Sequence, residues 1–324
     1  MKIAFFEIEN WEKEFIKKEL KNHKLVFFND PITKSKAKKI KDFDLIAIFI
    51  YSNITKEILN LLPKLKLIAT MSTGIDHIDI DECNKRKIKV KNVPFYGENT
   101  VAEHTFGLIL ALSRKICESH DRTRKDDFSL TGLEGFDLKD KTIGVIGVGH
   151  IGSHVARIAK GFEMKILGIS HDKDQKLIKE TGIEYTDLNN LLKKSDIVTL
   201  HVPYTKETHH IINKKNIKLF KKGSLLINTA RGGLADTEAI LYGLKNNILS
   251  GVGLDVLEGE CFIKEEKQLL TKHFLKECDL KTLLENHMLL NQKNVIITPH
   301  SAFYSKEALL RIVQTTIHNI KSFK

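Results

Sequence analysis

The stretch that decides the fold is Lys141–Lys160, which reads KTIGVIGVGHIGSHVARIAK. Its first part, Thr142–Ile146, is a short apolar run typical of a buried β-strand. Its last part, from His154 to Lys160, has the spacing of apolar residues found in a helix. The glycine string GVGHIG stands between them at positions 147–152. A glycine string in this context predicts a strand, a tight turn and a helix rather than an ordinary loop.

Each glycine of this string has a physical role in such a turn. Gly147 permits the tight turn, Gly149 lets a phosphate approach the backbone, and Gly152 lets the helix pack closely on the strand. The start of the helix adds unpaired N–H groups and a partial positive charge. The string therefore predicts a binding site for the pyrophosphate of a dinucleotide.

The position that distinguishes NAD from NADP does not carry the expected acid. An acidic residue about 20 residues after the glycines would bind the adenosine ribose. This chain has Ser170 at that place, and Asp172 follows two positions later. Without a carboxylate a 2′-phosphate is not repelled, and Ser170, His171 and Lys173 are able to contact one. We predict NAD as the cofactor and keep NADP as the alternative.

The rest of the chain alternates short apolar runs with longer amphipathic ones, as stacked βα units do. The fold class is α/β, with two Rossmann-like open parallel-sheet domains. Strands are predicted at Lys2–Phe6, Lys24–Phe28, Leu45–Phe49, Leu67–Thr70, Lys89–Asn92, Thr142–Ile146, Lys165–Ile169, Ile197–His201, Ser224–Asn228, Gly251–Leu254 and Val295–Thr298. Helices are predicted at Trp11–Leu20, Thr55–Leu62, Thr100–Cys117 and Lys306–Ile320, and from about Gly149, Asp187, Asn213 and Asp236.

Composition excludes several classes of partner. The 52 Lys and Arg and 41 Asp and Glu give a net charge of +11 over 324 residues. The lysines are interleaved with acids along the whole chain, which favours a solvated surface over a nucleic-acid site. No apolar run has the length of a membrane span, and the N-terminus does not read as a signal peptide, so we expect a cytoplasmic protein. The four cysteines, Cys83, Cys117, Cys261 and Cys278, lie far apart, which predicts reduced thiols and no metal site.

Three side chains that follow predicted strands suit hydride transfer to a 2-oxo acid. Such a reaction needs a cation for the substrate carboxylate and carbonyl, an acid/base for the substrate oxygen, and a carboxylate beside that acid/base. Arg231, His300 and Glu260 supply these types, and each comes after a strand of the second series. In open α/β sheets, ligands bind outside the carboxyl ends of the strands.

These motifs together resemble the D-isomer-specific 2-hydroxyacid dehydrogenase family, close to its D-lactate dehydrogenase branch. The resemblance runs from Met1 to about Ile320. It is carried by STGIDHID at 72–79, NTVAEHTFGLILALSRK at 99–115, GFDLKDKTIGVIGVGHIG at 135–152, SDIVTLHVPYTKETHHIIN at 195–213, INTARGGLADTEA at 227–239, GLDVLEGE at 253–260 and ITPHSAF at 297–303.

The resemblance implies a role for each site residue. Arg231 would bind and polarise the substrate, His300 would be the acid/base, and Glu260 would partner His300. The implied cofactor contacts are Gly147, Gly149, His150, Ile151, Gly152, Ser170, Val202, Pro203, Thr229, Ala230 and Asp255, the last near the nicotinamide carboxamide. The implied substrate contacts are Thr73 and Gly74, through their backbone N–H groups, with Tyr51, Tyr96 and Phe303 around them.

The resemblance also implies an architecture and an assembly. Residues 1–99 and 300–324 would form the substrate domain, and residues 100–299 the inserted nucleotide-binding domain. A homodimer would form through the second domain, with the 100–117 helix contributing. The chain departs from the family pattern at Ser170, at Met71, where many relatives have Arg, and in the long polar, partly helical segment 262–292.

The expected activity is reduction of a small 2-oxo acid to a D-2-hydroxy acid, with pyruvate and D-lactate as the first choice. Two alternatives remain open at this point. One is a glyoxylate or hydroxypyruvate reductase. The other is an NADH-sensing protein of the corepressor kind, which binds the cofactor without catalysis.

Overall fold

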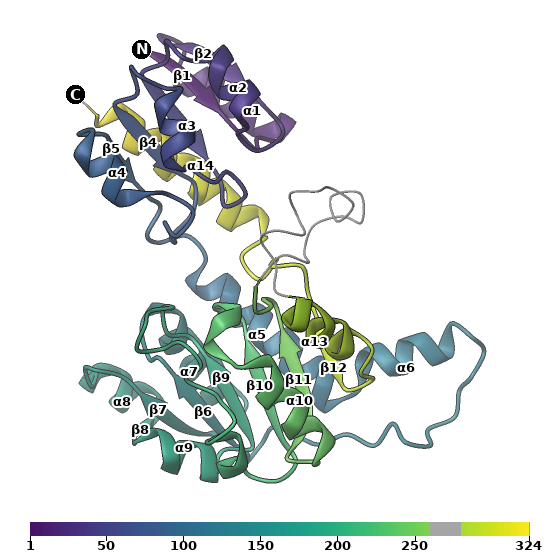
Figure 1. Ribbon diagram of the computed structural model, residues 1–324. Helices are drawn as coiled ribbons and strands as arrows, with labels where there is room; N and C mark the ends of the chain where they lie inside the picture. Colours follow the sequence, from purple (N-terminus) through teal and green to yellow (C-terminus); the bar gives the residue numbers. More distant parts are fainter. Residues whose placement is uncertain (260–279, 324) are drawn as a thin grey trace. The chain divides into compact units, whose positions relative to one another are not determined.

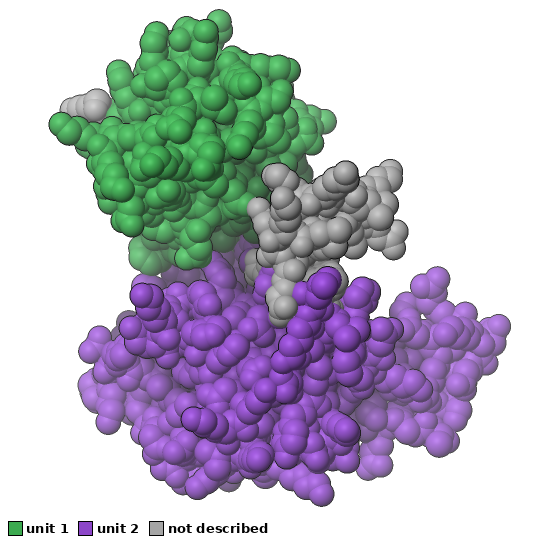
Figure 2. Space-filling view, in the orientation of Figure 1, with its two compact units in different colours: residues 1–96, 305–324 green, residues 97–304 purple. Residues whose placement is uncertain are grey.

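The computed structural model describes residues 1–259 and 280–323 and divides into two compact units. Unit 1 comprises Met1–Tyr96 and Ser305–Lys324, and unit 2 comprises Gly97–Tyr304 (Figure 2). The divisions lie a few residues from the predicted domain boundaries, and His300 falls in unit 2. The assignment of unit 1 to the substrate and unit 2 to the nucleotide stays a prediction.

Unit 1 is built on a five-stranded sheet in the order β2-β1-β3-β4-β5, and all its strand pairs are parallel. The strands are β1 (Lys2–Phe5), β2 (Lys24–Phe27), β3 (Leu45–Ile48), β4 (Leu67–Thr70) and β5 (Lys89–Lys91). The helices are α1 (Asn10–Glu19), α2 (Lys34–Lys39), α3 (Lys56–Asn60), α4 (Ile80–Lys85) and α14 (Lys306–Lys321). Helix α14 packs against α1 and β4, so the end of the chain returns to the first unit (Figure 1).

The central strands of unit 1 are apolar along their whole length because helices cover both faces of the sheet. Strands β3 and β4 read LIAI and LIAT, and every residue in them is buried. Continuous apolar runs of this kind are expected for parallel strands that are covered on both sides. The predicted strands in this unit are confirmed to within one residue at each end.

Unit 2 contains a seven-stranded parallel sheet in the order β12-β11-β10-β9-β6-β7-β8. The strands are β6 (Thr142–Ile146), β7 (Lys165–Ile169), β8 (Glu184–Tyr185), β9 (Ile197–Leu200), β10 (Ser224–Asn228), β11 (Leu249–Leu254) and β12 (Val295–Ile297). The α-helices are α5 (Glu98–Ser113), α6 (Ile116–Thr123), α7 (His150–Gly161), α8 (Gln175–Thr181), α9 (Leu188–Lys194), α10 (Thr237–Lys245) and α13 (Leu280–Leu290). The order reverses beside β6, which is where open α/β sheets bind ligands.

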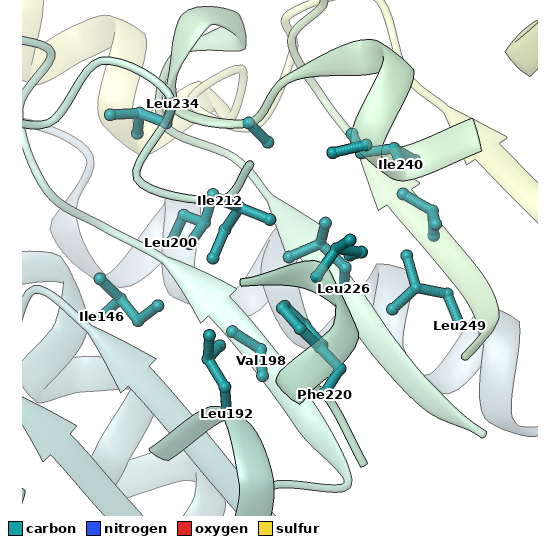
Figure 3. Packing of buried hydrophobic residues seen from close by; sticks show 14 of the residues in the cluster. Ile146, Leu192, Val198, Leu200, Ile212, Phe220, Leu226, Leu234, Ile240 and Leu249 are labelled. Atoms are coloured by element: carbon teal, nitrogen blue, oxygen red, sulfur yellow. The ribbon is translucent and has the colours of Figure 1, made fainter. Parts of the chain in front are cut away.

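The core of unit 2 lies on both faces of this sheet. On one face, Val198, Leu200 and Leu226 from the central strands pack with Phe220 and Ile240 from the connections (Figure 3). On the other face, α5 and α7 pack against each other and against the strands. The two layers hold the carboxyl ends of the strands in place, and the candidate site lies at those ends.

The predicted helix 100–117 is wrong at both ends. Helix α5 begins at Glu98 and ends at Ser113, and Lys115 has the left-handed φ of 50° before α6 begins. A continuing helix would use the Ser113 carbonyl as an acceptor. Here that carbonyl accepts from Phe136 N at 2.9 Å. The returning chain therefore ends the helix.

The predicted helix near Asn213 is also wrong. Asn213 N donates to Asn216 Oδ1 at 2.8 Å, and Asn216 N donates back to Asn213 Oδ1 at 3.3 Å. These reciprocal side-chain bonds close a short turn, and only a 3₁₀ segment, η1 (Ile217–Leu219), follows. Such local competition is typical of Asn. The two-residue strand β8 was not predicted, and of the segment 262–292 the structure describes α13 as helical.

Candidate active site

The glycine turn after β6 has the geometry that the sequence predicts. Gly147 has a φ of +99°, and a Cβ there would lie 2.6 Å from the carbonyl carbon of His201. A Cβ on Gly152 would lie 2.2 Å from the Gly147 carbonyl oxygen. Both positions therefore exclude any side chain, because backbone atoms cannot move aside.

Gly149 differs from these two glycines because, apart from its own residue and its neighbours along the chain, no described atom lies within 4 Å of the place of its Cβ. It is the N-cap of α7, and His150 and Ile151 open that helix. The first N–H groups of a helix have no partner within it, and its N-terminus favours anions. An open cradle in front of such a helix fits the pyrophosphate of a dinucleotide.

Ser170 follows the end of β7, and its hydroxyl donates to the Val148 carbonyl at 3.5 Å. It is half-buried beside the glycine turn, whereas Asp172 is exposed two residues further on. The residue that stands nearest to the turn at this strand end is therefore a neutral hydroxyl.

The loops after β9 and β10 carry the other predicted cofactor contacts. Val202 is half-buried and Pro203 is exposed. Thr229 Oγ1 lies 3.0 Å from Thr105 Oγ1, and Ala230 N donates to Asn228 Oδ1 at 3.0 Å. These bonds hold the start of the loop in a defined conformation.

Arg231 lies three residues past the end of β10. Its Nη1 donates to the Ala230 carbonyl at 2.8 Å, and its own carbonyl accepts from Asn228 Nδ2 at 2.8 Å. Asn228 thus bonds both Ala230 and Arg231 with one buried amide. The backbone that carries the guanidinium is fixed by the last residue of the strand.

His300 lies on a turn after β12 that a buried carboxylate holds. Asp255, the first residue after β11, is fully buried and accepts hydrogen bonds from the Thr298 hydroxyl, from Ser301 N at 2.8 Å and from Ala302 N at 2.8 Å. His300 N donates to the Asp255 carbonyl at 2.9 Å. The φ of His300 is +53°, a conformation that costs free energy and needs such surroundings to persist.

His104 of α5 supports the same turn. Its Nε2 lies 3.0 Å from Thr298 Oγ1 and 3.6 Å from Asp255 Oδ1. His104 thus helps to hold the turn from the side of α5. The predicted partner of His300, Glu260, lies outside the described residues, and its role stays a prediction.

The predicted substrate contacts Thr73 and Gly74 lie in unit 1, after β4. Thr73 Oγ1 donates to the Val93 carbonyl at 2.9 Å, and Ser72 Oγ donates to the Gly74 carbonyl at 2.7 Å. Asn92 Nδ2 donates to the Thr73 carbonyl at 2.8 Å. The carbonyl groups of Thr73 and Gly74 therefore accept hydrogen bonds from side chains.

The loop after β3 carries Tyr51, and Glu7 holds it. Glu7 accepts from Tyr51 N at 2.9 Å, from Phe49 N at 3.1 Å and from the Ser52 hydroxyl. The rings of Tyr51 and Phe49 meet edge to face, with centroids 6.4 Å apart. Burial raises the pKa of Glu7 above its ordinary value, although these hydrogen bonds and the charge of Lys36 oppose the rise.

The last two predicted contacts belong to different units. Tyr96 ends the first part of unit 1, and its carbonyl accepts from Arg311 Nε of α14 at 2.7 Å. Phe303 lies in unit 2, where its ring contacts His300 edge to face with centroids 6.5 Å apart. Met71, the residue that departs from the family pattern, is buried directly after β4.

Unit 2 alone brings together a cation, an imidazole and a dinucleotide turn at one edge of its sheet. Arg231, Asp255 and His300 follow β10, β11 and β12, which are adjacent strands. Among the described residues, no group of three His, Cys, Asp or Glu side chains is arranged to hold a metal ion. The chemistry that this edge can perform is binding an anionic substrate and transferring a proton.

Sequence reasoning did not find the residues that hold these loops. Glu7, Glu258 and the anchoring role of Asp255 depend on partners more than 20 positions away. Sequence position gives one usable signal: Asp255 comes directly after the apolar strand β11, and Glu7 comes two residues after the end of β1. In the parts of the chain that are described, no helix has the length and apolarity needed to cross a membrane.

The comparisons with known proteins agree with this site. Residues 106–302 match the family model described as D-isomer specific 2-hydroxyacid dehydrogenase, NAD binding domain. A 2-hydroxyacid dehydrogenase homolog of Zymomonas mobilis is 39% identical over 99% of this chain and 96% of its own length. A glyoxylate reductase of Thermococcus litoralis is 36% identical over 88% of this chain and 82% of its own length.

A solved structure extends the likeness to the whole fold. The D-lactate dehydrogenase of Aquifex aeolicus, complexed with NAD and lactic acid, superimposes with a TM-score of 0.87 at 40% identity. The match covers 99% of this chain and 95% of that one. The chain belongs to the D-isomer-specific 2-hydroxyacid dehydrogenases. Within that family it resembles the D-lactate dehydrogenases, and it is a nicotinamide-dependent oxidoreductase of 2-oxo and 2-hydroxy acids.

Proposed function

We propose that this protein reduces pyruvate to D-lactate with NADH. The observation that carries the proposal is the placement of Arg231, Asp255 and His300 just after the ends of β10, β11 and β12, three consecutive strands of the unit 2 sheet. The similarity to a D-lactate dehydrogenase that binds NAD and lactic acid supports the choice of substrate.

The side chains have distinct roles in this proposal. The planar guanidinium of Arg231 pairs with the substrate carboxylate and polarises the adjacent carbonyl. Protonated His300 gives its proton to the carbonyl oxygen as the carbon accepts a hydride, so the product is a hydroxy acid. The nicotinamide, when bound, supplies that hydride. Glu260 is proposed to stabilise the charged form of His300.

The turn residues of unit 1 are proposed to hold the substrate from its own side. Thr73 and Gly74 would offer backbone N–H groups to the carboxylate, and Tyr51, Tyr96 and Phe303 are proposed as further substrate contacts. The hydrogen bonds that occupy the carbonyl groups of Thr73 and Gly74 support this role. The turn can then present donors rather than acceptors to an anion.

Steady-state kinetics on a panel of 2-oxo acids tests the proposal. We expect NADH oxidation on addition of pyruvate, and a loss of kcat/KM of roughly 10²- to 10³-fold in Arg231→Ala. The matched control is Arg157→Ala, since Arg157 pairs with Glu180 on the surface of the same unit. NADH binding without turnover of any 2-oxo acid would refute catalysis and favour the NADH-sensing alternative.

Glyoxylate is the second candidate substrate. The glyoxylate reductase relative favours it, at 36% identity. The same panel separates the two, because the preferred substrate has the higher kcat/KM. A value for glyoxylate or hydroxypyruvate above that for pyruvate would replace the first choice.

For the cofactor we propose NAD, with Ser170 as the residue that sets the strength of the preference. A hydroxyl at this strand end neither repels a 2′-phosphate nor binds the ribose as strongly as a carboxylate. We expect Ser170→Asp to raise the ratio of kcat/KM for NADH over NADPH by about tenfold. An unchanged ratio would show that Ser170 is not the determinant.

We propose that the protein forms a homodimer through unit 2 and resides in the cytoplasm. Three large apolar side chains lie exposed on the segment between α5 and β6, which extends away from the sheet (Figure 1): Ile116, Phe128 and Leu130, the last two 75% and 83% exposed. A second copy of the chain would cover them. Light scattering after gel filtration tests this, and a monomer at micromolar concentration would contradict it.

A further inference from the structure

The turn that carries Arg231 is enclosed on two sides by other loops of unit 2. A Cβ on Gly232 would lie 2.0 Å from the Leu257 carbonyl oxygen, in the segment after β11. A Cβ on Gly233 would lie 2.7 Å from the ring of Tyr204, in the loop after β9. The backbone at Gly232 therefore lies against the main chain of the segment after β11, and the backbone at Gly233 lies against the ring of Tyr204.

The loop after β9 is bonded to this turn through its backbone. His210 N donates to the Gly233 carbonyl at 2.9 Å, and Ile212 N donates to the Leu234 carbonyl at 3.1 Å. His210 itself has a left-handed φ of 49°. The position of His210 thus bears directly on the position of the turn.

The ring of His210 reaches the segment on the other side of the turn. Its Nε2 lies 2.5 Å from Oε1 of Glu258, the residue after Leu257. The second oxygen of Glu258 accepts from Thr237 N at 3.1 Å and from Thr237 Oγ1 at 2.9 Å. Thr237 is the first residue of α10, where the helix dipole favours a carboxylate.

Both oxygens of Glu258 are therefore used, and the group is charged at neutral pH. Burial raises its pKa, but the hydrogen bonds from His210 and Thr237 outweigh burial, and the pKa lies below its ordinary value. Asn286 Nδ2 of α13 adds a hydrogen bond of 2.9 Å to the Glu258 carbonyl. One carboxylate thus joins the loop after β9, the segment after β11 and the start of α10.

We infer that His210 and Glu258 form a positioning pair that fixes the Arg231 turn and so sets the affinity for the substrate carboxylate. The inference rests on the proposed function, in which Arg231 binds that carboxylate. A guanidinium pairs with a carboxylate through two parallel hydrogen bonds, and this geometry is sensitive to small displacements. Neither residue needs to touch the substrate.

The neighbouring His209 provides a matched control. Its ring stacks on that of His210 with centroids 3.8 Å apart, and its Nδ1 lies 3.1 Å from the Tyr204 hydroxyl. It is exposed, whereas His210 is half-buried. A change at His209 alters the same loop and the same residue type but keeps the bond to Glu258.

The experiment compares His210→Ala, His210→Gln, Glu258→Gln and the control His209→Gln, with pyruvate and NADH. We expect His210→Ala to raise the KM for pyruvate about tenfold, less than the roughly hundredfold cost of a 1 Å misplacement in an active site. We expect kcat within about threefold and the Kd of NADH within about twofold of the unmodified protein.

The two conservative variants separate positioning from general stability. His210→Gln keeps a donor for Glu258 and should recover most of the pyruvate affinity. In Glu258→Gln the side-chain NH2 group replaces one of the two accepting oxygens, so a donor meets either Thr237 or His210. This variant should therefore raise the KM for pyruvate as much as His210→Ala does. Equal KM values in His210→Ala and His209→Gln, or a lower Tm with unchanged KM, would overturn the inference.

Hydrogen exchange keeps this test independent of the proposed function. If the unmodified protein turns over no 2-oxo acid, the proposed function is refuted. Hydrogen exchange then still tests whether His210 and Glu258 hold the Arg231 turn. We expect peptides that span residues 231–237 to exchange at least about tenfold faster in His210→Ala than in His209→Gln, because the turn opens more often. Equal exchange rates would refute the positioning role, whether or not the protein is active.

Discussion

Glu7 in unit 1 and Asp255 in unit 2 each hold a loop of their own unit through the same kinds of hydrogen bond, but the left-handed residue stands at a different place in each. Each is a carboxylate just past the end of a strand, and each accepts two backbone N–H groups and one hydroxyl from the loop of an adjacent strand. Glu7 holds the loop with Tyr51, and Asp255 holds the turn with His300. Both loops carry residues of the proposed active site.

The two anchors differ in where the unfavourable backbone conformation lies. Glu7 itself has a φ of +60°, whereas in unit 2 the anchor is regular and His300 has the φ of +53°. Asp255 also has a shorter side chain, and its backbone carbonyl accepts from His300 N. The proposed acid/base is thus held by both the main chain and the side chain of its anchor, while the Tyr51 loop depends on a longer and strained one.

Of the two anchors, Asp255 is expected to give the larger effect, in the variant Asp255→Asn. The amide would turn a donor toward Ser301 N, Ala302 N or the Thr298 hydroxyl, and leaving such groups unpaired in a buried site costs about 1–3 kcal/mol each. Because His300 would shift, kcat/KM for pyruvate should fall roughly 100-fold. Stopped-flow and steady-state assays measure this directly.

Asp187→Asn is the control for that variant. Asp187 caps α9 in the same unit and accepts from Asn190 N at 3.0 Å, and Asn caps helices about as well as Asp. A kcat/KM of Asp255→Asn near that of this control would show that the turn holds His300 without its carboxylate.

A smaller effect is expected from Glu7→Gln. The side chain at position 7 would lose one of its two accepting oxygens, so the loop after β3 would be held less firmly. The KM for pyruvate should therefore rise about tenfold, or about 1.4 kcal/mol. The affinity for NADH should not change, because the predicted dinucleotide turn lies in unit 2. Fluorescence titration with NADH, beside kinetics, checks both.

Glu14→Gln controls for loss of a glutamate in unit 1, since Glu14 is exposed and pairs with Lys17 on the surface of helix α1. An increase in KM as large in this control as in Glu7→Gln would mean that charge, rather than the loop bonds, is responsible. If kcat/KM for pyruvate falls about tenfold in both Glu7→Gln and Asp255→Asn, the two carboxylates hold their loops equally well.

The smallest effect concerns stability alone and comes from Glu12→Gln. Burial raises the pKa of Glu12 to about 7, opposed by its hydrogen bond from Glu9 N and helped by the charge of Glu9. Between the ordinary pKa of 4.5 and about 7, the folded chain binds more protons than the unfolded chain, so the free energy of unfolding falls as pH rises. Glu12→Gln removes this fall.

Thermal unfolding at two pH values tests this prediction. At about pH 8 the variant should be more stable by about 1–2 kcal/mol, and at about pH 4 it should gain nothing. Gln keeps the capping bond to Glu9 N, so helix α1 should be unchanged. An equal gain at both pH values would show that ionisation is not the cause.

The strands and the glycine turn could be predicted because they depend on patterns that extend over only a few residues of the sequence. Thr142–Ile146, Lys165–Ile169 and Ser224–Asn228 match the structure end to end, because buried parallel strands are apolar along their length and are bounded by turn residues. The roles of Gly147 and Gly152 could also be predicted from the sequence. Gly152 lies against the Gly147 carbonyl of the same turn, and Gly147 lies against the backbone that follows the neighbouring strand β9.

The candidate site was only partly predictable. The residue types and strand ends of Arg231 and His300 could be found in the sequence, but the strand order that places β10, β11 and β12 side by side could not. The resemblance to a family supplied their roles. Glu260 lies outside the described residues, so its predicted role still depends on that resemblance.

What the sequence by itself determined is therefore all of the strands except β8, the glycine turn and the class of chemistry. What only the tertiary structure decided is how the loops are held. The Ser113 carbonyl ends a helix because Phe136 returns to it, Glu7 bonds a loop more than 40 positions away, and His210 meets Glu258 across the Arg231 turn. Propensity and periodicity act over a few residues, whereas these bonds form only after folding brings distant strand ends to one edge of a sheet.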